Sequence, residues 1–199
     1  MNKGRCVLLL FILSSLAVMI VQCTQVKKKQ DSRGPSYAGS STCVSCHKDV
    51  SDSYVHNAHF NTSRLLTTAE ATDSLGLPTT EFVFNEHTKV GVEHKDGGLF
   101  QIAYINGKAQ KSERTDMVFG AGLSAYTFAY WNHNQLMQLP LNYLTKEKIW
   151  VNSPGFPEEQ VYFGRPIVVR CLECHSSNVD MKIIQNDDLT VTEEFVKGS

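Results

Sequence analysis

The sequence predicts an α+β fold in which an antiparallel β-unit lies between two partly helical segments. Alternating apolar residues between Glu81 and Tyr130 are typical of half-buried strands. Asp96-Gly97-Gly98 and Asn106-Gly107 indicate hairpin turns, because such turns need positive φ. One pentad of the form Cys-x-x-Cys-His occurs on each side of this β-rich stretch. We therefore expect a first pentad segment at 42–78, a β-rich unit at 79–165 and a second pentad segment at 166–199.

The amino-acid composition argues against two classes of protein, nucleic-acid-binding proteins and disordered proteins. The 199 residues carry 19 basic and 20 acidic side chains, for a formal net charge of −1. Nucleic-acid-binding proteins normally present a strongly basic face, so this near-neutral balance argues against that class. The 42% of hydrophobic residues and the 6 prolines argue against wholesale disorder. The positions of the 6 cysteines and 7 histidines therefore carry most of the functional information.

Residues 1–22 match an export signal. Lys3 and Arg5 precede an apolar run from Val7 to Val21, which is shorter than the ~20 residues of a membrane-spanning helix. The end of the run, Ile20-Val21-Gln22-Cys23, resembles the lipobox of bacterial lipoproteins, where the cysteine is lipidated. Ordinary cleavage nearby and an uncleaved anchor helix are the alternatives. We expect an exported lipoprotein on the periplasmic side of the membrane, with residues 23–41 as a linker.

Four of the six cysteines belong to the two pentads, Cys43-Val44-Ser45-Cys46-His47 and Cys171-Leu172-Glu173-Cys174-His175. The pentad is the attachment pattern of c-type haem. Two thiols one helical turn apart can each add to one haem vinyl group, and the adjoining imidazole then becomes the proximal ligand of the iron. The sequence therefore predicts two haem c groups. Their covalent links would be Cys43, Cys46, Cys171 and Cys174, and their proximal ligands His47 and His175.

Three other uses of paired cysteines fit the pattern less well. Zinc-knuckle pairs usually lie close together in the sequence, whereas these two pairs are far apart. Disulfides are common in exported proteins, but they do not require a histidine after each pair. Thioredoxin-like motifs open a helix within a βαβ pattern, which is not evident around either pair.

The other five histidines are candidate distal ligands. A helix predicted from Asp49 to Arg64 would place His56 and His59 on one face, at positions i and i+3. His59 lies twelve residues after His47, about 18 Å along a straight helix, so it is expected to reach the second haem rather than the first. We predict His59 as a distal ligand and His56 as the alternative. The remaining candidates, expected more often at the surface, are His87 and His94 in strand-like sequence and His133 in an Asn-rich turn.

Within the β-rich unit we expect four to six strands. The aromatic cluster of Tyr126, Phe128, Tyr130 and Trp131 is predicted to be core rather than the wall of a cofactor site. The stretch from Phe119 to Gly122 lacks the third glycine and the βαβ context of a dinucleotide-binding loop. Its glycines are therefore expected to allow close approach of backbone.

These features resemble exported bacterial multihaem c-type cytochromes related to the tetrahaem cytochrome c of nitrifying bacteria. Besides the first pentad, the similar stretches are Tyr54 to Arg64, Gly120 to Tyr143, Trp150 to Phe156 and Arg165 to His175. The resemblance implies that a histidine shortly after the first pentad, here His59, is a distal ligand, often to a neighbouring haem. Such proteins usually carry further pentads. None follows His175, so the resemblance implies a truncated or short member.

Two functions from different classes fit these predictions. In an electron carrier, histidines on both faces of each haem close the iron to substrates, and the protein relays single electrons between periplasmic redox partners. In a haem enzyme or enzyme subunit, one iron stays open and reduces or senses a small molecule such as a nitrogen oxide or peroxide. The carrier is favoured because several candidate distal histidines are present and no catalytic set is visible. No nucleic-acid partner is expected.

Overall fold

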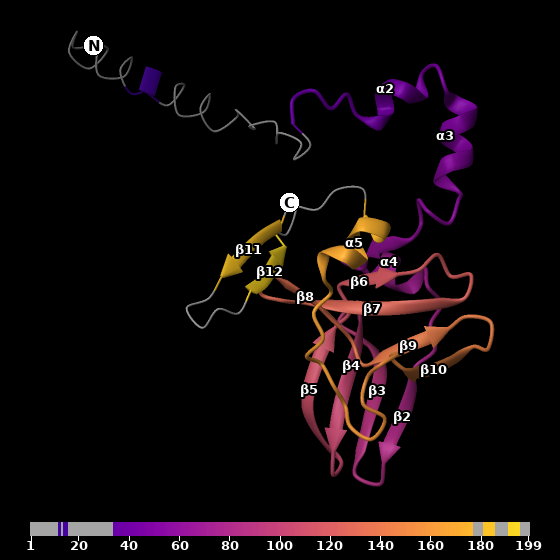
Figure 1. Cartoon of the computed structure of the whole chain (residues 1–199), viewed down its shortest axis with the longest axis vertical. Coiled ribbons are helices and arrows are strands. Elements are labelled where there is room, and N and C mark those ends of the chain that lie inside the picture. Colours follow the sequence, from indigo (N-terminus) through magenta and orange to yellow (C-terminus); the bar gives the residue numbers. More distant parts are fainter. Residues whose placement is uncertain (1–11, 13, 16–33, 177–180, 186–190, 196–199) are drawn as a thin grey trace, which may run out of the picture. The chain divides into compact units, whose positions relative to one another are not determined.

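The computed structural model describes residues 12, 14, 15, 34–176, 181–185 and 191–195 (Figure 1). The chain divides into two compact units, Met1–Gly39 and Ser40–Ser199. The predicted export signal and lipidation site, Cys23, lie outside the described residues apart from three positions of the apolar run. Among the residues that are described, no helix is both long and apolar enough to cross a membrane.

The second unit combines helices with antiparallel sheets and is mainly β, which confirms the predicted mixed α+β class. Its helices are α2 (Ser40–Val44), α3 (Lys48–Val55), α4 (Ala69–Asp73) and α5 (Val169–His175). Its strands are β1 (Ser63–Leu65), β2 (Thr80–Asn85), β3 (Thr88–Lys95), β4 (Gly98–Ile105), β5 (Lys108–Arg114), β6 (Met117–Phe119), β7 (Ala125–Asn132), β8 (Gln135–Gln138), β9 (Leu141–Leu144), β10 (Ile149–Asn152), β11 (Met181–Gln185) and β12 (Val191–Phe195).

Two antiparallel sheets form the body of this unit. The four-stranded sheet has the order β2-β3-β4-β5, and the six-stranded sheet has the order β1-β6-β7-β9-β10, with β8 also paired to β7. The prediction of four to six strands in residues 79–165 is wrong, because nine strands, β2 to β10, lie there. Strands such as β6 and β8, with three and four residues, are too short for an alternating pattern to identify them. The hairpin of β11 and β12 follows α5.

The two predicted hairpin turns are confirmed. Asp96 and Gly97 have φ of 50° and 67°, and they connect β3 to β4. Asn106 and Gly107 have φ of 50° and 74°, and they connect β4 to β5. Two consecutive positive φ values match the right-handed twist of the flanking strands, which is why Asp-Gly and Asn-Gly are favoured there.

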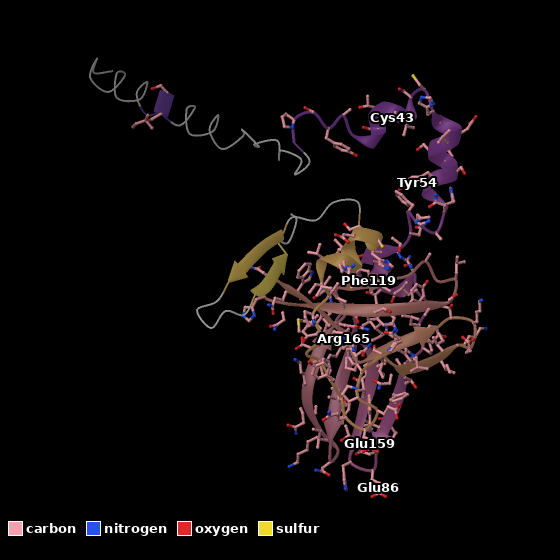
Figure 2. The ribbon with its side chains drawn as sticks, in the orientation of Figure 1. Cys43, Tyr54, Glu86, Phe119, Glu159 and Arg165 are labelled. Carbon is pink, nitrogen blue, oxygen red and sulfur yellow. The ribbon has the colours of Figure 1, made fainter. Side chains whose placement is uncertain are left out.

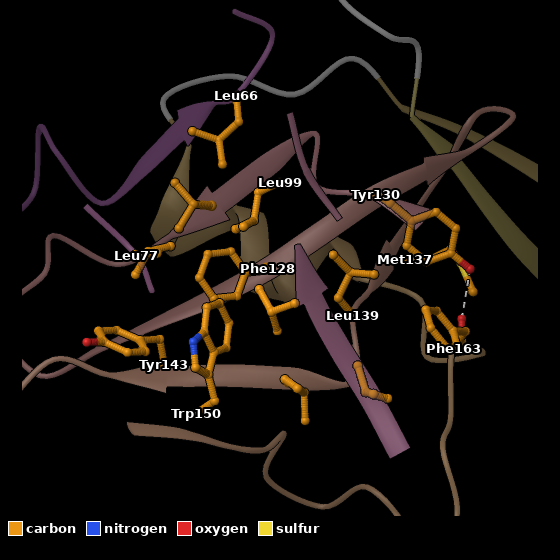
Figure 3. Close-up of a cluster of buried hydrophobic side chains, with 14 of the residues drawn as sticks. Leu66, Leu77, Leu99, Phe128, Tyr130, Met137, Leu139, Tyr143, Trp150 and Phe163 are labelled. Carbon is orange, nitrogen blue, oxygen red and sulfur yellow. Dashed lines mark hydrogen bonds between the residues drawn. The ribbon is translucent and has the colours of Figure 1, made fainter. Parts of the chain in front are cut away.

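The main core lies between the two sheets (Figure 3). Val90, Val92 and Leu99 enter it from the four-stranded sheet, and Phe128 enters it from β7. Gln101 is fully buried and binds the backbone of Leu141 at both ends of its amide. Its Nε2 donates to the Leu141 carbonyl at 3.0 Å, and its Oε1 accepts from the Leu141 N–H at 2.8 Å. These two hydrogen bonds connect the sheets and give both the nitrogen and the oxygen of the buried amide a partner.

Strand β7 divides its aromatic side chains between two cores. Phe128 and Tyr130 are buried in the main core, and Tyr126 packs against it. Trp131 packs on a second buried cluster together with β6 and α5. This alternation follows from the period of two in a strand. The predicted core role of the aromatic cluster is confirmed. The second cluster consists of Phe119, Ala129, Leu136, Ile167 and Leu172.

Of the two glycines between β6 and β7, Gly120 confirms the predicted close approach of backbone, whereas Gly122 lies against a side chain. Gly120 has φ of 111°, and a Cβ at this position would collide with the backbone carbonyl of Ala125. Gly122 has φ of 80°, and a Cβ there would collide with the Tyr126 hydroxyl. Any other residue at these positions would be strained both in its backbone and in its contacts.

Candidate functional site

The second pentad lies entirely within α5, above the second core cluster. Leu172 is only 5% exposed and anchors the helix on that cluster, whereas Cys171 and Cys174 are exposed. Positions i and i+3 share one face of a helix, so the two thiols project from the side away from Leu172. The helix therefore presents both thiols together while its apolar residue is buried. Figure 2 shows Phe119, a member of the same cluster, close to this helix.

His175, the last residue of α5, is half-buried and held by residues that are distant in the sequence. Its Nδ1 lies 2.7 Å from the Thr62 hydroxyl oxygen. Ser63 donates a hydrogen bond from its hydroxyl to the His175 carbonyl, at 2.5 Å. The ring meets Phe119 edge to face, with 5.5 Å between ring centroids and an angle of 77°. The chain that follows the first pentad thus fixes both the ring and the backbone of the second pentad's histidine.

His59 and the second pentad line the same cavity. This cavity of about 320 Å³ is bounded by His59, Cys174 and His175, together with Tyr54, Phe60, Thr62, Ser63 and Ser176. His59 also lines a neighbouring cavity of about 300 Å³ beside Gly120 and Leu123. The volume of the first cavity falls near the lower end of the range for small-molecule sites, about 300–1,000 Å³. Histidines from two distant segments therefore line one cavity.

The helix predicted from Asp49 to Arg64 is confirmed only as far as Val55, and its extension to Arg64 is wrong. Helix α3 ends at Val55, His56 is its C-cap, and His59 lies in the turns that follow. Two asparagine side chains form hydrogen bonds with backbone N–H and C=O groups at or just after the end of α3. Asn57 accepts from the Phe60 N–H at 2.8 Å, and Asn61 donates to the Val55 carbonyl at 2.9 Å. Such local side-chain bonds compete with helix continuation.

The first pentad has a different setting. Cys43 lies in α2, Cys46 follows it in a turn, and His47 is the N-cap of α3. The N–H groups of Cys46 and His47 both donate to the Cys43 carbonyl, at 3.2 and 2.9 Å respectively. Both cysteines and His47 are exposed, and α3 contains no buried residue. This pentad therefore forms a local turn that no core cluster supports.

His56 lies at the end of α3 with one ring nitrogen engaged. Its Nδ1 is 2.6 Å from the Asp52 carbonyl oxygen. A carbonyl only accepts, so the neutral imidazole has its proton on Nδ1 and its lone pair on Nε2. His56 is therefore able to act as a metal ligand through Nε2, from the same helix that begins next to the first pentad.

The other three histidines lie on the β-rich part of the chain. His94 is on β3, and its Nε2 bonds the Leu77 carbonyl at 3.0 Å. His133 is in the turn between β7 and β8, and its Nδ1 bonds the Asn132 side chain at 3.1 Å. His87 is exposed in the turn between β2 and β3, next to Glu86, which lies at the end of the sheets opposite Phe119 (Figure 2). None of the three lines the cavity beside His175.

All four pentad cysteines are free thiols and exposed. Within the described part of the chain, no three His, Cys, Asp or Glu side chains are grouped so as to hold a metal ion. Exposed thiols in pairs, each pair followed by an imidazole, are the groups that covalent haem attachment needs. The residues present therefore fit haem c at each pentad.

Thr62, Ser63 and Phe119 were not identified from the sequence as members of the site. A threonine and a serine in a polar stretch carry no functional signal by themselves, and their partner His175 lies 112 to 113 positions away.

No protein-family model matches the chain, and no curated protein or solved structure matches it either.

Proposed function

We propose that the protein is an exported c-type cytochrome that transfers electrons through two covalently bound haems. The observation that carries this proposal is the convergence of Cys174, His175 and His59 on one cavity. The pentads supply the attachment chemistry, and the cavity brings an imidazole from elsewhere to the second of them. Haem c, when bound, supplies a reversible one-electron couple whose potential depends on its axial ligands and surroundings.

The chain's own residues have distinct roles in this proposal. Cys171 and Cys174 form the thioether links of the second haem from the exposed face of α5. His175 would be its proximal ligand, and His59, which lines the same cavity, would be its distal ligand. Two imidazoles on one iron leave no position for a substrate, which suits electron transfer rather than catalysis.

At the first pentad, Cys43 and Cys46 are the thioether links and His47 is the proximal ligand. His56 is the distal candidate for this iron, because its Nδ1 is bonded to the Asp52 carbonyl and the neutral imidazole then has its lone pair on Nε2. The exposure of this whole segment would leave a haem edge accessible to solvent. An accessible edge favours brief contacts with periplasmic redox partners over small surfaces.

A second candidate function is a haem enzyme or gas sensor in which the first iron stays open. The observation that favours it is the lack of any buried residue in α3, so that His56 is held only by its bond within the helix. An open iron in this setting would reduce or sense a small molecule such as a nitrogen oxide or peroxide.

The location of the protein is part of the proposal. Residues 1–22 would direct export, and Cys23 would carry the lipid that anchors the protein on the periplasmic side of the membrane. The haem-attachment pattern and the export signal are consistent with each other. The anchor would keep both haems near the membrane surface.

The test of the proposal is haem content in a full-length chain that is matured with the haem-attachment machinery. A denaturing gel stained for haem should show a band for the wild type, weaker bands for Cys46→Ala and for Cys174→Ala, and none for the double variant. An unchanged band in the double variant would refute the proposal. The EPR spectrum of the oxidised protein then separates the two functions, since a carrier has low-spin haem only and an open iron gives a high-spin signal.

A further inference from the structure

Thr62 occupies the junction between the two histidines that face the cavity. Its N–H donates to the His59 carbonyl at 3.4 Å, and its hydroxyl oxygen is 2.7 Å from Nδ1 of His175. Its own carbonyl accepts from the Gly120 N–H at 2.7 Å, which attaches it to the end of β6. Gly120 in turn cannot carry a side chain. Thr62 is thus held by backbone on both sides and has its hydroxyl directed at the His175 ring.

The contacts of Nδ1 favour one tautomer of His175. The Thr62 carbonyl oxygen lies 3.4 Å from Nδ1, and the Thr62 hydroxyl oxygen lies closer, at 2.7 Å. The carbonyl can only accept, so it favours a proton on Nδ1, and the hydroxyl oxygen has lone pairs that can accept this proton. The lone pair then resides on Nε2. Metal-bound histidines usually donate their other ring N–H in this way, which fixes the ring and makes it a stronger ligand.

We infer that Thr62 is the positioning residue of the second haem site: its hydroxyl accepts the Nδ1 proton of His175, directs Nε2 to the iron and lowers the reduction potential of that haem. The inference rests on the proposed function and adds to it a determinant of potential. A more basic imidazole stabilises ferric iron over ferrous iron, so removal of the hydroxyl raises the potential.

The experiment uses the full-length chain with Cys43→Ala and Cys46→Ala, which carries only the haem at Cys171 and Cys174. Thr62→Val keeps the shape of the side chain and removes the acceptor, whereas Thr62→Ser keeps the hydroxyl. Thr115→Val is the matched control, because Thr115 is fully buried and its hydroxyl has no hydrogen-bond partner. The midpoint potential is measured by redox titration for all four proteins.

Thr62→Val is expected to raise the ferrous-to-ferric equilibrium ratio at a given potential by up to about tenfold, which is ~59 mV for one electron. Thr62→Ser and Thr115→Val are expected to leave the potential at the parent value. A Thr62→Val protein with attached haem and an unchanged potential would overturn the inference. So would Thr62→Ser shifting the potential as far as Thr62→Val, because the effect would then not come from the hydroxyl.

A second readout needs no haem. Nitrogen-15 NMR of the unmatured full-length chain should report the Nδ1–H tautomer of His175 in the parent and in Thr62→Ser, and a shift toward the Nε2–H form in Thr62→Val. The same tautomer in all three proteins would overturn the role of Thr62. Failure of the wild type to acquire haem at either pentad would instead refute the proposed function, so the two failures are distinguishable.

Discussion

The two pentads have the same pattern but different structural support. The second is one helix, α5, anchored by Leu172 in a buried cluster and held at His175 by Thr62 and Ser63. The first spans the end of α2, a turn and the start of α3, and its cysteines and histidine are exposed. A five-residue motif can therefore specify its chemistry locally while its rigidity depends on residues far away in the sequence.

This contrast bears on function. A preorganised ligand set changes little when an iron changes oxidation state, which is the property that a rigid metal site contributes. An unsupported pentad can adapt to a partner or a ligand. The predictions below test whether the second site is the rigid one.

The largest effect is expected for His59→Ala. In the chain that carries only the second haem, loss of the distal imidazole should convert the whole low-spin signal to high spin. In the chain that carries only the first haem (Cys171→Ala and Cys174→Ala), the same substitution should change nothing. EPR of the oxidised proteins is the measurement. A high-spin signal from the first-haem chain alone would assign His59 to the other iron.

The second position of each pentad gives the next comparison. Leu172→Ala removes a side chain that is 5% exposed and should lower the free energy of unfolding by about 2–5 kcal/mol. Val44→Ala, the matched change in the first pentad at a half-buried position, should cost no more than about 1 kcal/mol. Urea unfolding of the full-length proteins measures both. Equal costs would mean that the first pentad is packed as tightly as the second.

A smaller difference is expected for serine hydroxyls. Ser63→Ala removes the hydrogen bond to the His175 carbonyl and should cost about 1 kcal/mol. Ser45→Ala removes an exposed bond to the Thr42 carbonyl and should change stability by less than about 0.5 kcal/mol. The same urea titration compares them. A neutral Ser63→Ala would show that the segment after the first pentad does not hold α5.

The smallest difference is expected for the thiols themselves. All four are exposed, so alkylation of the unmatured native chain should proceed at similar rates in both pentads. Peptide mass spectrometry after timed labelling with iodoacetamide gives the rates separately. If Cys171 and Cys174 react only as fast as the chain unfolds, then their thiols are inaccessible in the folded protein. The two pentads would then differ in thiol reactivity as well as in structural support.

Local signals in the sequence predicted local structure. Asp96-Gly97 and Asn106-Gly107 require positive φ, and both turns formed as predicted. Alternation identified the longer strands, such as β3 and β4, because each buries one face against the core. Gly120 was correctly assigned to a close backbone contact. Each of these predictions depends on residues within a few positions of one another.

Long-range pairing could not be predicted. Strand β1 has three residues and is defined by its register with β6, from Ser63↔Phe119 to Leu65↔Met117. Its own sequence therefore reads equally well as the end of the helix that was predicted through Arg64. The asparagines that end α3 act through side-chain bonds, which the helical pattern does not record. The approach of His59 to the second pentad follows from this pairing, whereas the sequence argument for it assumed a straight helix that in fact ends at Val55.

The bond between Thr62 and His175 closes a loop across 113 positions. Closing a flexible loop of that length costs about 4 kcal/mol of chain entropy, which the strands in between must offset first. A chain is synthesised from its N-terminus, so the first pentad exists and is complete long before its counterpart. The turn of the first pentad can therefore form without any distant residue, whereas the contact between Thr62 and His175 can form only once the intervening sheets have assembled.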